Sequence, residues 1–204
     1  ATAASNPSAG KYWWSFDGSN DSLLGGNLGI TTACTIVVAG SVNSLGATQV
    51  LFAEATNGVQ VYLNTSGTII FSKAGTGNIV LTSAAAIVAG VPFVITARLS
   101  AGTAVIRNLG VQAATAATAY TFSAITGARI GTDFNGTSFP TNGALGWVVP
   151  LPTALSDAEC LTVERLVGSQ FPGMSTVDGD ANAMLLEDGS GFLTMETGDL
   201  LLLE

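Results

Sequence analysis

Short segments rich in β-branched residues recur along the first three quarters of the 204-residue chain, and their starts lie roughly 8–12 residues apart. Turn-forming pairs such as Ser66-Gly67, Asn135-Gly136 and Asn142-Gly143 separate them. This spacing predicts an antiparallel sandwich of two sheets. The expected strands span residues 31–39, 48–54, 58–64, 68–73, 78–82, 92–100, 103–109 and 144–149.

The pattern of apolar residues supports this prediction and adds one helix. Residues 59–63 and 93–99 alternate apolar and less apolar positions, which is typical of strands with one buried face. Residues 156–168 predict a helix, because Ser156 and Glu159 have the spacing of a capping box. The expected apolar stripe of this helix consists of Cys160, Val163, Leu166 and Val167.

Composition excludes several classes of protein. Six basic against fourteen acidic residues, a net charge of −8, argue against nucleic-acid binding. The chain has no histidine, which removes every mechanism that needs an imidazole base or ligand. The uncharged stretch 74–97 is interrupted by glycines and Pro92, so we expect strands there and no transmembrane helix.

Some single residues allow specific expectations. Cys34 and Cys160 are too few for a disulfide framework and are expected to be buried free thiols. Glu54 ends an apolar strand before a turn, so we expect a solvated side chain. Trp147 is expected in the core. The adjacent residues Trp13 and Trp14 should face opposite ways, one in the core and the other covered by a neighbour or subunit.

The C-terminal quarter differs from the rest. Residues 1–156 hold four acids and five bases, whereas residues 157–204 hold ten acids and one base. Three similar units, 184–187, 193–196 and 201–204, predict a small meander that needs a packing partner. We expect an N-terminal arm (1–11), a sandwich (12–172) and an acidic oligomerisation or attachment repeat (173–204). The expected subunit contacts are Leu185, Leu186, Phe192, Leu193, Leu201 and Leu203.

Three stretches together resemble the concanavalin A-like, laminin-G-like jelly-roll superfamily. Residues 15–23 are similar to its FDG-x-x-D-x-L opening strand, residues 90–111 to its central strand pair, and residues 130–159 to its closing strand with the following L-S-D-A-E helix start. Phe93 stands where tryptophan is usual, and one residue separates Asn108 from Gly110, as a bulge would. The resemblance implies a jelly roll of two curved sheets and little about chemistry.

The C-terminal repeat resembles segments of structural proteins from tailed-bacteriophage virions. With no visible signal peptide, this resemblance implies a non-enzymatic virion protein that is assembled in the host cytoplasm. We expect capsid decoration, in homo-oligomers that contact the major capsid protein or other virion proteins. The alternative is a glycan-binding receptor-recognition module of a tail or fibre.

The candidate sites follow from these two hypotheses. No two sandwich carboxylates lie two residues apart on a strand, so a glycosidase pair is not expected, nor is any other enzyme activity. The best glycan loop comprises Asp133, Phe134, Asn135 and Phe139; its alternative is an ordinary Asn-Gly hairpin over packed rings. No cofactor is expected. The jelly-roll resemblance permits a calcium site at the sandwich rim, with Asp21, Asp133 and Asn135 as candidate ligands.

Overall fold

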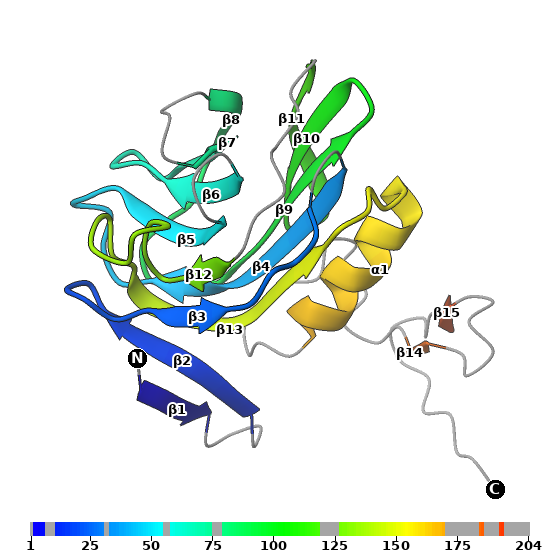
Figure 1. Cartoon of the computed structure of the whole chain (residues 1–204). Helices are drawn as coiled ribbons and strands as arrows, with labels where there is room; N and C mark the ends of the chain where they lie inside the picture. Colours follow the sequence, from blue (N-terminus) through cyan, green and yellow to red (C-terminus); the bar gives the residue numbers. More distant parts are fainter. Residues whose placement is uncertain are drawn as a thin grey trace, which may run out of the picture.

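The computed structural model describes residues 2–6, 11–30, 33–54, 58–74, 79–118 and 127–169, together with the backbone of 184–185 and 192–193. Within these residues the chain forms two large antiparallel sheets and one helix, α1 (Asp157–Gly168). Figure 1 shows the two curved sheets face to face, with α1 on the outer side of the larger one. The predicted two-sheet sandwich with one helix is confirmed.

The two sheets are built from strands that are distant in sequence. The seven-stranded sheet has, in spatial order, β1 (Thr2–Asn6), β2 (Lys11–Asp17), β13 (Asn142–Leu151), β4 (Cys34–Val42), β9 (Phe93–Ser100), β10 (Thr103–Asn108) and β11 (Val111–Ala117). The six-stranded sheet has β3 (Leu23–Gly25), β12 (Ala128–Ile130), β5 (Gln49–Glu54), β6 (Val59–Leu63), β7 (Thr68–Lys73) and β8 (Ile79–Ala86).

The alternation in the sequence identifies the face of each strand that is buried between the sheets. Val59, Val61 and Leu63 of β6 lie in the main core, which also contains Ile95 and Leu99 of β9. The periodicity did not indicate β3, β11 and β12, because two of them are three residues long and β11 is rich in alanine. β1 lies within the predicted N-terminal arm and pairs with β2.

The turn between β10 and β11 differs from the bulge that the motif comparison suggested. Leu109 and Gly110 both have positive φ, 48° and 76°, which is the backbone of a tight two-residue hairpin. A shift in pairing register does occur in this hairpin, but it lies between Ile106 and Arg107. The extra residue between Asn108 and Gly110 therefore forms part of the turn.

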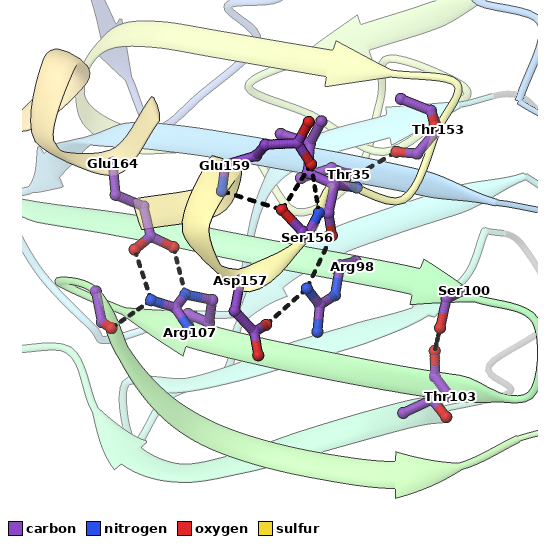
Figure 2. Close-up of polar contacts among 12 residues, drawn as sticks. Thr35, Arg98, Ser100, Thr103, Arg107, Thr153, Ser156, Asp157, Glu159 and Glu164 are labelled. Atoms are coloured by element: carbon purple, nitrogen blue, oxygen red, sulfur yellow. Dashed lines mark hydrogen bonds and ion pairs between the residues drawn. The ribbon is translucent and has the colours of Figure 1, made fainter. Parts of the chain in front are cut away.

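Polar contacts hold α1 against the outer side of the seven-stranded sheet (Figure 2). Ser156 caps the helix, since its Oγ accepts from the Glu159 amide and the Glu159 side chain accepts from the Ser156 amide. Arg98 of β9 contacts the first turn, with 2.7 Å between Nη1 and Asp157 Oδ1. Arg107 pairs with Glu164, which is buried. The predicted capping box is confirmed.

The predicted apolar stripe of α1 is partly wrong. Cys160 and Val167 are buried and Val163 is half-buried, but Leu166 is 61% exposed. Glu164 faces the sheet in its place. The sheet offers a buried guanidinium there, so a charged helix residue is stabilised where the sequence pattern predicts an apolar one.

The position of Trp147 also departs from expectation. Trp147 is 46% exposed on β13 and does not belong to the core, because a register shift between Leu145 and Trp147 turns its side chain to the outer side of the sheet. Trp14 is 43% exposed, and its cover by a subunit stays a prediction. Trp13 is half-buried and packs against the smaller apolar cluster that contains Val167.

Both cysteines are buried free thiols, as predicted. Burial raises the pKa of the Cys34 thiol to about 12, and it also raises that of Cys160. Both are therefore protonated and unreactive at neutral pH.

The C-terminal segment forms a separate two-stranded sheet in which β14 (Met184–Leu185) pairs with β15 (Phe192–Leu193). Leu186, Leu201 and Leu203, predicted as subunit contacts, lie outside the described residues. The backbone of Leu185, Phe192 and Leu193 lies in this hairpin, and their contact role stays a prediction. Of the described helical segments, none has the length and apolarity to cross a bilayer.

Candidate functional site

A pocket of about 400 Å³ opens on the six-stranded sheet, on the side facing away from the seven-stranded sheet. Cross-strand register places Tyr62 of β6 opposite Ile70 of β7, and Gln60 opposite Ser72. These positions alternate with the core residues Val59, Val61 and Leu63, so they belong to the opposite face of the sheet. The pocket is lined by Thr48, Gln60, Tyr62, Ser72, Lys73, Asp133, Phe134 and Phe139.

The segment 131–141, between β12 and β13, supplies the other wall of this pocket. Asp133 is its centre: Oδ1 accepts the amide N–H groups of Thr137 and Ser138, each at 3.1 Å. Its backbone closes the same turn, since its carbonyl accepts from Gly136 N–H at 2.9 Å and its own N–H donates to the Ser138 carbonyl at 3.0 Å. The buried Asp133 carboxylate therefore organises the loop.

Contacts with the neighbouring strand β5 fasten this loop to the sheet. Val50 N–H donates to the carbonyl of Phe139 at 2.9 Å, and Thr141 Oγ1 donates to the carbonyl of Val50 at 2.8 Å. From β12, Arg129 Nε donates to the carbonyl of Phe134 at 3.1 Å. Both phenylalanines are thus fixed through their own backbone oxygens.

Three of the four residues in the predicted glycan loop line this pocket: Asp133, Phe134 and Phe139. Asn135 is exposed and is not among the lining residues. The Asn-Gly pair does not form a two-residue hairpin, because the turn is organised by the Asp133 side chain. Whether these residues contact a sugar stays a prediction.

Sequence reasoning missed the half of the pocket that comes from the sheet. Gln60, Tyr62, Ser72 and Lys73 were not singled out, although alternation placed Gln60 and Tyr62 on the face opposite the core. That signal indicates polar positions on a strand. It does not indicate which outward residues a distant loop will enclose.

Two of the three calcium candidates, Asp21 and Asp133, accept hydrogen bonds from backbone amides. Among the described residues, no group of three or more acidic, cysteine or histidine side chains is placed to hold a metal ion. Asp21 Oδ2 accepts the Asp17 N–H at 3.1 Å, and Asp133 Oδ1 accepts the two loop amides. Calcium binding through Asp21, Asp133 and Asn135 stays a prediction.

Glu54 contradicts the expectation of a solvated side chain. It is 1% exposed at the end of β5, where Oε2 accepts the Val59 N–H at 3.2 Å. Burial raises the pKa of its carboxyl to about 7. Glu54 does not line the pocket. Among the described residues that do, Asp133 is the one with a carboxylate. Hydrolysis of a glycosidic bond by paired carboxylates needs two.

No protein-family model matches the sequence, and no curated protein does. Solved structures do match the fold. The CBM40 of the Ruminococcus gnavus IT-sialidase, bound to α2,3-sialyllactose, is 16% identical with a TM-score of 0.58, over 72% of this chain and 100% of that one. A SAP-like pentraxin of Limulus polyphemus, a heptamer, is 18% identical with a TM-score of 0.57, over 74% of this chain and 80% of its own.

Whole sialidases match over part of their length. The Trypanosoma rangeli sialidase is 11% identical with a TM-score of 0.59, over 80% of this chain and 28% of the enzyme. At these identities the likeness shows the fold, which is a jelly-roll sandwich of the concanavalin A-like class. These neighbours give no support to a role in a virion.

Proposed function

We propose that this chain is a glycan-binding module and that its pocket holds one sugar residue of a larger glycan. The observation that carries the proposal is the composition of the pocket. Tyr62, Phe134 and Phe139 supply aromatic surface, while Thr48, Gln60 and Ser72 supply hydroxyl and amide groups. Small-molecule sites commonly combine an apolar lining with a few polar groups that fix orientation, in volumes from about 300 Å³ upwards.

The solved neighbours support this proposal at the level of fold. One is a carbohydrate-binding module whose structure contains α2,3-sialyllactose, and others are parts of sialidases. The same sandwich can therefore carry a sugar site. The ligand of this chain depends on the residues of its own pocket, because a shared fold does not transfer specificity.

The test is a calorimetric titration of the purified chain with α2,3-sialyllactose, α2,6-sialyllactose, lactose and a panel of neutral terminal sugars. We expect binding to at least one member. Gln60→Ala should weaken it about tenfold, since a hydrogen bond to the ligand is lost. The matched control is Asn135→Ala, which changes an exposed residue of the same loop that does not line the pocket. Absence of binding to the whole panel, or equal binding by wild type and Gln60→Ala, would contradict the proposal.

The setting that we propose for this module is a virion surface, on the strength of the C-terminal repeat alone. The copy number of the protein in purified virions distinguishes a location on a tail or fibre from capsid decoration. A handful of copies indicates receptor recognition on a tail or fibre, whereas hundreds indicate capsid decoration. Absence of the protein from particles contradicts both.

A further inference from the structure

Phe139 has an unusual backbone for its residue type. Its φ is +55°, in the left-handed region, and Pro140 follows it, whereas a residue before proline prefers extended backbone. The other described non-glycine residue with positive φ is Leu109, which lies in the tight β10–β11 turn beside Gly110. No such hairpin explains Phe139.

Fixed contacts on both sides of Phe139 impose this conformation. Before it, the Ser138 carbonyl accepts the Asp133 N–H, and the Ser138 amide is bound by Asp133 Oδ1. At Phe139 itself, the carbonyl accepts from Val50 N–H. After it, Thr141 N–H donates to the Gly131 carbonyl at 2.7 Å. These hydrogen bonds together therefore hold Phe139 in its strained backbone conformation.

Packing does not explain why an aromatic residue occupies this position. Phe139 is 51% exposed and lies at the pocket, outside both apolar clusters. Left-handed backbone is strained for an ordinary L-residue, while glycine and asparagine adopt it more readily. Residues with strained backbone cluster at functional sites.

We infer that Phe139 is the ligand-stacking residue of the pocket, that Asp133 is its positioning residue, and that the ligand is a pyranose with an apolar C–H face turned to the Phe139 ring. This inference rests on the proposed glycan-binding function and deepens it. The ring supplies surface for stacking. The sheet residues Gln60 and Ser72 supply polar groups on the floor of the pocket.

The test for Phe139 is the pair of variants Phe139→Asn and Phe139→Tyr, in the full chain. Asparagine suits a positive φ but removes the ring, so sugar affinity should fall about tenfold while the melting temperature stays equal or rises. Tyrosine keeps the ring and should retain binding within about threefold. Unchanged affinity in Phe139→Asn would overturn the inference. So would a large drop in its melting temperature, because the ring would then be structural.

The test for Asp133 compares Asp133→Asn with Asp133→Ala. The asparagine side-chain oxygen can still accept the Thr137 and Ser138 amides, so binding should survive within about twofold. Alanine removes the acceptor and should reduce affinity about as much as Phe139→Asn. Equal loss in both Asp133 variants at unchanged melting temperature would show that the carboxylate contacts the ligand, which overturns its role as a positioning residue.

The two proposals fail in different ways. If Gln60→Ala weakens binding but Phe139→Asn does not, the pocket binds sugar and Phe139 is not the stacking residue. If the wild-type chain binds no sugar on the panel, the glycan-binding function itself is wrong.

Discussion

Arg107 on β10 and Glu164 on α1 form a two-point ion pair beneath the helix. Arg107 Nε lies 2.8 Å from Glu164 Oε1, and Nη2 lies 3.2 Å from Oε2. The Glu164 side chain is 1% exposed and the Arg107 side chain 9%. Arg107 Nη2 also donates to the Gly110 carbonyl, so one guanidinium joins the helix to the β10–β11 turn (Figure 2).

Breaking this pair on one side should strongly destabilise the protein. Glu164→Ala leaves a buried guanidinium without its partner, and we expect the free energy of unfolding to fall by about 3–5 kcal/mol. The double variant Arg107→Met/Glu164→Leu should recover most of that loss, because no uncompensated charge remains. Urea denaturation measures both. The control is Asp157→Ala, which removes an exposed side chain and leaves its partner Arg98 bonded to the Leu155 carbonyl, with an expected loss of about 1 kcal/mol or less. Equal losses in Glu164→Ala and Asp157→Ala would contradict the prediction.

Glu54 should make stability depend on pH near neutrality. Its pKa is raised by burial to about 7 in the folded protein, above the ordinary value of 4.5. The folded state therefore binds a proton more tightly than the unfolded state. Its contribution to stability is complete below about pH 4.5 and is lost as the pH rises through 7.

The measurement for Glu54 is the free energy of unfolding from pH 5 to 8, for wild type and Glu54→Gln. Glutamine remains neutral, so the wild type should lose stability relative to the variant as the pH rises. Parallel curves across this range would show that Glu54 does not titrate there in the folded protein.

Gly131 should tolerate no side chain. Its φ is +89°, and a Cβ atom there would lie 2.2 Å from Cε1 of the buried Phe16 ring. Gly131→Ala should therefore destabilise the sandwich by about 3 kcal/mol or more and weaken sugar binding, since this residue begins the pocket loop.

Gly26→Ala is the matched control for Gly131. A Cβ at Gly26 meets no atom within 4 Å, so we expect a change within about 0.5 kcal/mol. Thermal melts measure the stability of the two variants relative to the wild type. A stable Gly131→Ala would mean that the Phe16 ring can move aside.

Deleting residues 178–204 should abolish self-association and leave the sandwich folded. The prediction follows from the repeat, since a small two-stranded hairpin is marginally stable alone and gains from a partner. Light scattering across a range of concentrations measures the mass of both proteins. The double variant Leu185→Ser/Leu193→Ser tests two of the predicted contacts within the full chain. A full-length chain that stays monomeric at every concentration would remove the oligomerisation role.

Local sequence determined the helix and most of the strands. Ser156 and Glu159 contain the whole capping box within four residues, and the 59–63 alternation shows which side of β6 is buried. These features depend on neighbours in the chain, so a short stretch of sequence contains their cause. The exposed Trp147 and the buried Glu54 were predicted wrongly, because each depends on what other elements place beside it.

Only the tertiary structure decided the pocket. The loop residues Asp133, Phe134 and Phe139 could be proposed from sequence, but their partners Gln60 and Ser72 lie about 60 to 80 positions away and meet them through strand order and register. The same holds for Glu164, which is buried because Arg107, 57 residues earlier, lies beneath it. Long-range pairing is a property of the assembled sheets, and one-dimensional periodicity does not contain it.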